Sequence, residues 1–417
     1  MRVFVFILCA AFTLAFAQDD SMFDTEETIV QESEGSERDL ADELLKGTTL
    51  SIGGDFELEA EASYESARDE AFSVGLNILN TTLFLDARPN SDFRMFAKGE
   101  LAYRTETGLD LSLDELFADF DVDDRVFVRA GKQTLNWGVG YFFSPANLVN
   151  LERIDPENPD EELSGPVSIK AQLPVGTNNL TGYLLLDDRN NEEGVDASLA
   201  ARYEFLLAGF EVTTGALLEG SGHWALMGTA SGAVDELSVF AEAVLEGNSE
   251  KVFVVEDSGD LSTATSDSLF FSGAVGARYS YTSEAELYTV ALSAQYYFNG
   301  LGYEDSSLFT DNSAALGALL ARGELSLDDL QARGQHYAAL SLSAPDLAKT
   351  ELTPSVFWLS NLSDGSGVVD ANLSYAGIDY LTPSIGYRLN YGEEGAEYSP
   401  LGVNHSLSLA LDLRGSF

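Results

Sequence analysis

Charged side chains of both signs gather between positions 88 and 132. Acidic residues outnumber basic ones by 69 to 22 in the whole chain, yet this segment holds seven of the 22 basic residues. In three successive stretches the charges fall at alternate positions, which share one face of a β-strand. Those residues are Arg94, Lys98, Glu100 and Arg104, then Glu115, Asp119 and Asp121, and then Arg125 and Arg129.

Such a ladder would place an acidic strand between two basic ones. If it faces a water-filled lumen, its field orients ions and dipolar solutes, and Lys170 is a further candidate for the same wall. The alternative is that the charges pair across strands and only stiffen the interior. If these strands belong to a barrel in a membrane, the ladder should point inward in either case, because an Arg or Lys facing lipid at the bilayer midplane costs about 2–4 kcal/mol.

A second concentration of charge follows in residues 150–165, which are acidic and interrupted by prolines. Its carboxylates are Asp155, Glu157, Asp160, Glu161 and Glu162. Two interpretations stay open for this segment. It either folds into a pore and narrows it, or it forms a surface loop that binds Ca²⁺ weakly.

The residues needed for catalysis do not occur in a usable pattern. The sequence contains no G-x-S-x-G elbow, no metal-ligand cluster and no phosphate-binding loop. His405 and Ser406 are adjacent in a strand-like segment, so their side chains point to opposite faces and cannot pair. We therefore predict no enzymatic activity, no catalytic residue, no bound metal and no cofactor.

Residues 1–17 have the features of a secretory signal peptide. Arg2 precedes an almost wholly apolar run, and Ala15 and Ala17 supply the small residues needed for cleavage before Gln18. Cys9, the only cysteine, would leave with this peptide. Residues 18–47 are acidic and polar, which predicts a periplasmic segment that is either disordered or acts as a plug or partner-binding element.

From residue 48 to residue 417 the sequence alternates between apolar and polar positions in recurring segments. We count about eighteen such segments, with sixteen as the alternative. Short connections alternate with longer ones such as 134–165, 247–268 and 299–335, and residues 313–331 are compatible with one or two short helices. Outer-membrane barrels have short periplasmic turns and longer extracellular loops, so we predict an all-β, transmembrane, antiparallel β-barrel with both termini in the periplasm.

The last segment, residues 403–417, keeps its alternation to the final residue. Leu409, Leu411, Leu413 and Phe417 all lie on its apolar side. This pattern resembles the C-terminal signal by which bacterial outer-membrane barrels are recognised for insertion. The competing interpretation is the last strand of a soluble β-sandwich or of a lipocalin-like barrel.

The most distinctive stretch reads R-A-G-K-Q at residues 129–133, N-W-G at 136–138 and F-S-P-A-N at 143–147. It resembles a motif of several porin-like outer-membrane barrel families, including the carbohydrate and alginate-export type. The resemblance covers a short stretch of the chain, and it implies the superfamily rather than a particular substrate.

Together these features predict a porin of the outer membrane, through which small hydrophilic solutes or ions diffuse passively. The expected partners are membrane lipid, those solutes and the barrel-assembly machinery, with a homotrimer as one option for assembly. The acidic composition argues against nucleic acid. Two alternatives stay open: a surface-interaction barrel of adhesin or receptor type with a closed lumen, and a hydrophobic-substrate transporter plugged by its N-terminal segment.

Overall fold

The computed structural model describes residues 49–66, 73–75, 77–104, 108–187, 196–257, 260–283, 288–304 and 307–417. The predicted signal peptide and the acidic segment at 18–47 lie outside the described residues. Within the described part, no helix is long and apolar enough to cross a membrane.

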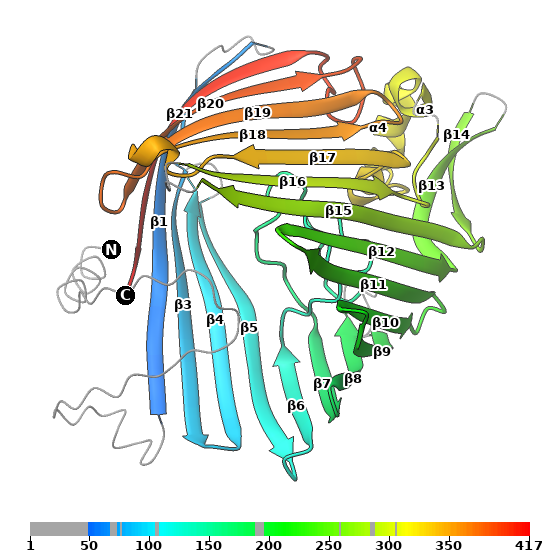
Figure 1. Ribbon diagram of the computed structural model, residues 1–417. Coiled ribbons are helices and arrows are strands. Elements are labelled where there is room, and N and C mark those ends of the chain that lie inside the picture. Colours follow the sequence, from blue (N-terminus) through cyan, green and yellow to red (C-terminus); the bar gives the residue numbers. More distant parts are fainter. Residues whose placement is uncertain are drawn as a thin grey trace.

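One antiparallel sheet closes on itself to form a barrel (Figure 1). It contains 19 strands, but β2 and β3 follow one another along β1 and act as a single wall strand, so the wall has 18. This confirms the predicted count and excludes a two-sheet sandwich. The wall strands are β1 (Thr49–Glu65), β2 (Ser73–Gly75), β3 (Asn77–Asn90), β4 (Phe93–Arg104), β5 (Gly108–Val122), β6 (Val126–Lys132), β7 (Val167–Val175), β8 (Asn178–Asp187), β9 (Asp196–Leu207), β10 (Phe210–Leu218), β11 (Trp224–Val234), β12 (Leu237–Gly247), β15 (Phe270–Thr282), β16 (Thr289–Phe298), β17 (His336–Ser343), β18 (Leu352–Asn361), β19 (Ser366–Tyr375), β20 (Leu381–Tyr391) and β21 (Asn404–Ser416).

The barrel closes where β21 pairs with β1. The register runs from Asp55 opposite Ser416 to Glu65 opposite Ser406. Phe417 extends it, because its backbone N–H donates to Gly54 O at 2.9 Å and its carbonyl accepts from Gly54 N at 3.0 Å. A Cβ at Gly54 would lie 2.4 Å from the carbonyl oxygen of Thr82, so the close approach of three strands here requires glycine.

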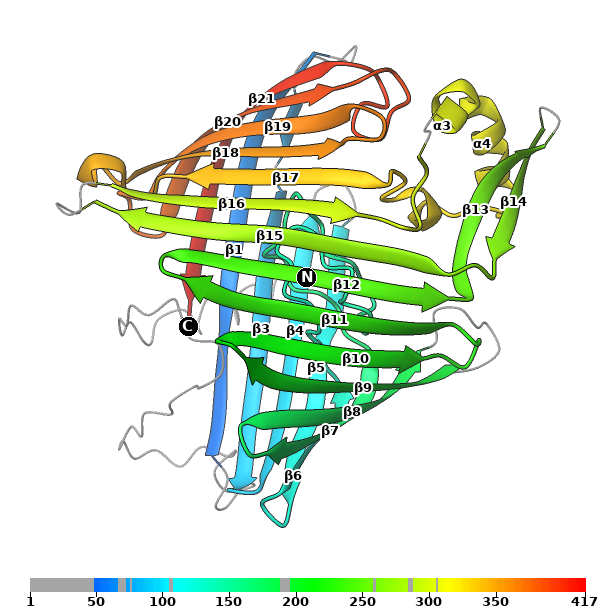
Figure 2. The same cartoon turned by 45° about the vertical axis from the view of Figure 1, so that its right-hand side comes forward.

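Short turns collect at one end of the barrel and long connections at the other, as predicted. We call these the turn end and the loop end. At the turn end, Ala208 and Gly209 join β9 to β10 with φ of 53° and 87°, the two positive values of a type I′ hairpin turn. At the loop end the longest connections are residues 133–166, 248–269 and 299–335. In Figure 2 the loop end lies to the right of the β12–β17 wall.

Two of the long connections pack together at the loop end. One contains the hairpin of β13 (Ser249–Asp257) and β14 (Asp260–Ser266), and the other contains α3 (Ser307–Asp311), α4 (Ser313–Ala321) and the 3-10 helix η1 (Asp328–Leu330). Val254, Phe309, Leu316, Leu319 and Leu325 form their shared core. α4 and η1 lie within residues 313–331, where one or two short helices are predicted, whereas α3 and the hairpin are not predicted.

The barrel is apolar outside, as the alternation along β21 illustrates. Leu407, Leu409 and Leu411 are 46%, 56% and 49% exposed, although they are large apolar side chains. The residues between them share the other face with charged positions such as Glu59, which lies opposite Asp412. An exposed apolar face this continuous suits lipid rather than water.

We expect Leu409→Arg to destabilise the barrel by about 2–4 kcal/mol in a bilayer, because it places a cation in lipid near the middle of β21. Ala410→Arg is the matched control, since this neighbour points inward and its cation stays hydrated. The measurement is the free energy of unfolding in lipid vesicles, from denaturant titration. Equal losses at the two positions would contradict the assignment of the outer face.

Candidate functional site: a lumen divided by an internal loop

The connection between β6 and β7, residues 133–166, lies inside the barrel (Figures 1 and 2). Its residues form hydrogen bonds or ion pairs with inward side chains on widely separated strands between β5 and β20. Strands this widely separated can reach one segment only across the lumen, so the same contacts identify the inner face. The wall residues are Glu115 on β5, Arg202 on β9, Glu242 on β12, Gln295 on β16 and Arg388 on β20.

Glu242 holds the loop from the β12 wall. Its carboxylate accepts hydrogen bonds from the backbone N–H groups of Val139 at 2.5 Å, Gly140 at 2.6 Å and Ala146 at 3.0 Å, and from Ser144 Oγ at 3.0 Å. The side chain is only 4% exposed. Because a buried carboxylate needs donors to replace water, these four groups stabilise its charge and also fix the loop.

Gln295 on β16 holds the next residues in a similar way. Its Oε1 accepts from the N–H groups of Tyr141, Phe142 and Phe143 at 3.1, 2.8 and 3.3 Å. Its Nε2 donates back to the carbonyl of Phe143. The loop apex is therefore attached to two neighbouring regions of one wall through its backbone.

Two glycines make this attachment possible. A Cβ at Gly138 would lie 1.6 Å from Ser144 Oγ, and one at Gly140 would lie 2.0 Å from the carbonyl oxygen of Phe143. Gly138 belongs to the motif singled out in the sequence, and the structure gives a physical reason for it. The loop folds too tightly around Glu242 and Gln295 to accept a side chain at either position.

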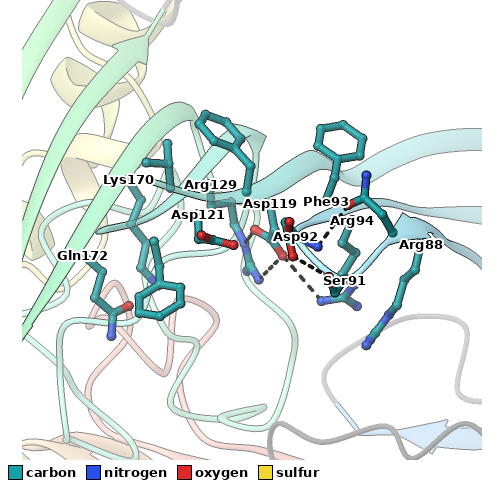
Figure 3. Close-up of a pocket in the computed structure, with 14 residues that line it drawn as sticks. Arg88, Ser91, Asp92, Phe93, Arg94, Asp119, Asp121, Arg129, Lys170 and Gln172 are labelled. Atoms are coloured by element: carbon teal, nitrogen blue, oxygen red, sulfur yellow. Dashed lines mark hydrogen bonds and ion pairs between the residues drawn. The ribbon is translucent and has the colours of Figure 1, made fainter. Parts of the chain in front are cut away.

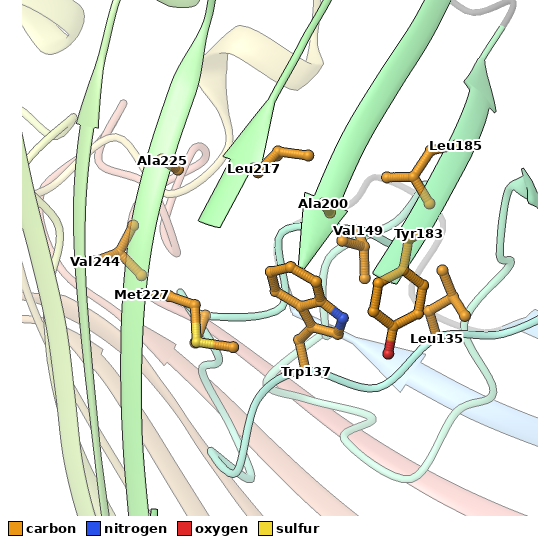
Figure 4. Packing of buried hydrophobic residues seen from close by; sticks show 11 residues of the cluster. Leu135, Trp137, Val149, Tyr183, Leu185, Ala200, Leu217, Ala225, Met227 and Val244 are labelled. Carbon is orange, nitrogen blue, oxygen red and sulfur yellow. The ribbon is translucent and has the colours of Figure 1, made fainter. Parts of the chain in front are cut away.

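One side of the loop is apolar and packs against the wall (Figure 4). Trp137 is 2% exposed and lies against Tyr183, with ring centroids 5.5 Å apart, among Leu217, Met227 and Val244. Farther along, Phe142 and Phe143 form a second buried cluster with Tyr337, Ala339 and Leu359. Burial of each large apolar side chain contributes about 1.5–3 kcal/mol, so the apolar side binds the β8–β18 wall firmly.

The other part of the loop carries the five predicted constriction carboxylates. Glu162 pairs with Lys98 on β4, and Glu157 pairs with Arg388 on β20 at 2.5 Å. Asp155 and Glu161 bond within the loop, to Glu157 N and Asn158 Nδ2.

Asp160 accepts a hydrogen bond from the hydroxyl of Tyr141 at 3.0 Å. Burial and the Asp160 carboxylate both raise the pKa of Tyr141 above its usual value, because both disfavour the phenolate form.

The charge ladder forms a network on the inner face near the turn end (Figure 3). Arg129 contacts Asp119 at 2.6 Å, and Arg94 contacts Asp119 at 3.6 Å and Asp86 at 3.0 Å. The guanidinium of Arg129 also lies 3.9 Å from the ring centroid of Phe117. Asp86, which joins the ladder from β3, was not among the predicted residues.

The structure brings some predicted residues together and separates others. Lys98 contacts the loop rather than Glu115, whose carboxylate accepts from Thr134 N at 3.3 Å. Arg125 lies in the turn before β6, outside the strand assigned to it. Glu100 and Arg104 share the inner-facing positions of β4, where they lie opposite Ser112 and Gly108.

Asp121 and Lys170 line a pocket of about 350 Å³ with Arg94 and Arg129.

The sequence does not predict the roles of Glu242 and Gln295, because a single polar residue in an alternating strand gives no indication of its partner.

Removing Glu242 should free the loop without opening the barrel. We expect Glu242→Ala to leave buried N–H groups unpaired, at a cost of about 1–3 kcal/mol each, and to make residues 133–166 accessible to protease. Limited proteolysis of the folded protein, with the cleavage sites identified by mass spectrometry, measures this. Glu61→Ala on β1 is the control, and identical cleavage of wild type and Glu242→Ala would contradict the anchoring role.

Comparison with known proteins addresses the fold. No protein-family model and no curated protein matches the chain. The outer membrane protein OpdK of Pseudomonas aeruginosa superposes with a TM-score of 0.50 at 9% identity, covering 88% of this chain and 99% of that chain. The outer membrane channel DcaP of Acinetobacter baumannii covers 89% and 98% at 11% identity, with a TM-score of 0.45. The strand pairing and the superposition on OpdK show that the chain has the closed antiparallel barrel fold of outer-membrane porin-like proteins.

Proposed function

We propose that the protein is an outer-membrane channel through which small hydrophilic solutes diffuse passively. The observation that carries this proposal is a closed barrel of 18 strands with an apolar exterior and a charged inner face. Barrels of 16–18 strands are wide enough to leave an aqueous channel. No chemical step is needed, because the lumen itself selects solutes by width and charge.

Orientation follows from the connections. The turn end would face the periplasm and the loop end the exterior, with cleavage before Gln18 and residues 18–47 left in the periplasm. Leu409, Leu411, Leu413 and Phe417 would serve the assembly machinery as an insertion signal. The proposal includes assembly of three copies of this chain into a homotrimer.

In this proposal the internal loop is the constriction. Its apolar side anchors it and its carboxylates narrow the remaining space, as Glu157 reaches Arg388 on β20 and Glu162 reaches Lys98 on β4. The Arg94, Asp119 and Arg129 network lines the lumen toward the turn end, with Lys170 beside it.

A surface-interaction barrel is the second candidate. The packed unit of β13, β14, α3 and α4 favours it, because a loop-end structure with its own apolar core could present a binding surface. The two candidates differ in whether the lumen conducts.

Single-channel recording of the refolded mature protein in a planar bilayer separates them. We expect steady open channels, since the inner face is hydrated and charged. A folded, heat-modifiable barrel without conductance would contradict the channel and favour surface binding.

The ladder can be tested by reversing its cations. We expect the double variant Arg94→Glu with Arg129→Glu to shift the reversal potential in a salt gradient toward stronger cation preference. Arg94→Gln with Arg129→Gln removes the charges without reversing them, and should shift the potential less. If neither pair changes the reversal potential, the ladder plays no part in selectivity.

A further inference from the structure

The internal loop, residues 133–166, covers one part of the inner face of the barrel and leaves another part exposed. On the strands from β8 to β18, the inward side chains that face the loop include several that are almost completely buried: Tyr183 is 5% exposed, Val244 2%, Ala274 1% and Leu359 0%. On β1 from Asp55 onward, and along the whole of β21, no residue is buried. One wall of the lumen therefore faces the packed loop, and another remains accessible.

The contacts of the internal loop show the same asymmetry. Its anchors lie on the strands from β4 round to β20, with Lys98 and Arg388 as the two flanking positions. Among the described residues, none of the hydrogen bonds or ion pairs identified for the loop involves β21 or β1. Between β20, which carries Arg388, and β4, which carries Lys98, the sheet contains β21, β1 and β3.

We propose that the channel is one-sided and that solutes pass between loop residues 155–162 and the wall formed by β21, β1 and β3. The ion pairs of Glu157 and Glu162 hold the two ends of this loop segment across that wall. The β8–β18 side is filled by the loop and carries no flow. This inference rests on the proposed channel function and adds the route of the solute to it.

The route also determines the class of solute. Glu57, Glu59 and Glu61 alternate along the inner face of β1, and Asp412 lies opposite Glu59 on β21. Arg414 neutralises Glu57 at 2.5 Å, which leaves an acidic excess on this wall. The loop segment opposite is also acidic, with Asp155, Asp160 and Glu161 in addition to its two paired glutamates. Carboxylates on both sides of a narrow passage favour cations and repel anions, so the preferred solutes are small cations.

Cysteine substitution can locate the route, because the only native cysteine, Cys9, lies in the predicted signal peptide. Ser408→Cys places a thiol on the open inner face of β21, opposite Ser63. Thr229→Cys is the matched control on the covered wall, where Thr229 faces inward opposite Glu242 and is 4% exposed. A trimethylammonium methanethiosulfonate reagent, added during single-channel recording, is expected to cause a stepwise loss of current through Ser408→Cys only.

A charge substitution tests the solute class in the same recordings. Glu59→Gln should shift the reversal potential in a potassium chloride gradient toward zero, because it removes an acidic group from the route. Glu256→Gln, in the exposed loop-end hairpin, should leave the reversal potential unchanged.

The possible failures are distinguishable. Loss of current through Thr229→Cys, or none through Ser408→Cys, overturns the one-sided route while the channel stands. An unchanged reversal potential in Glu59→Gln overturns the assigned cation preference. A wild-type protein that conducts no current contradicts the channel function itself, and the inference falls with it.

Discussion

Backbone pairing between β21 and β1 turns the sheet into a closed barrel. It satisfies the backbone groups that an open sheet would leave at two edges, which is the condition for a sheet to stand in lipid. Closure also defines an inside. Only then does the alternation along each strand separate apolar residues such as Leu409 from charged ones such as Glu59, and only then can a connecting segment be enclosed.

The internal loop then turns a wide barrel into an asymmetric one. A lumen formed by 18 strands would be evenly hydrated if its wall were the only feature. Glu242 and Gln295 instead bind the backbone of the loop, and Trp137 and Phe142 pack its apolar side on the wall, so one half of the inner face loses water. The other half of the inner face, which is polar, remains hydrated. The division between dry packing and wet passage thus comes from two hydrogen-bonding side chains and the shape of one loop.

Much of the fold could be predicted because its signals are local. Strand alternation is visible within each segment, and the lengths of connections show which end of the barrel each lies at. Side-chain contacts between residues on different strands are harder to predict from the sequence. The ladder was predicted around Arg94, Asp119 and Arg129, but Asp86 enters it from another strand, and Lys98 contacts Glu162 of the loop instead of Glu115. The sequence predicts only a long connection where the hairpin of β13 and β14 forms, because this hairpin packs on Phe309 and Leu316 from a distant part of the chain.

The amino-acid sequence alone predicts the class of fold, the approximate number of strands, the face to which each strand residue points and the lack of a recognisable catalytic pattern. These follow from the period of the chain and from residue types within a few positions of one another. The position of residues 133–166 inside the barrel, and the wall on which they pack, depend on contacts between residues far apart along the chain. Glu242 is 103 residues from Val139, and Gln295 is 154 residues from Tyr141. Local sequence patterns carry no signal of contacts at that separation.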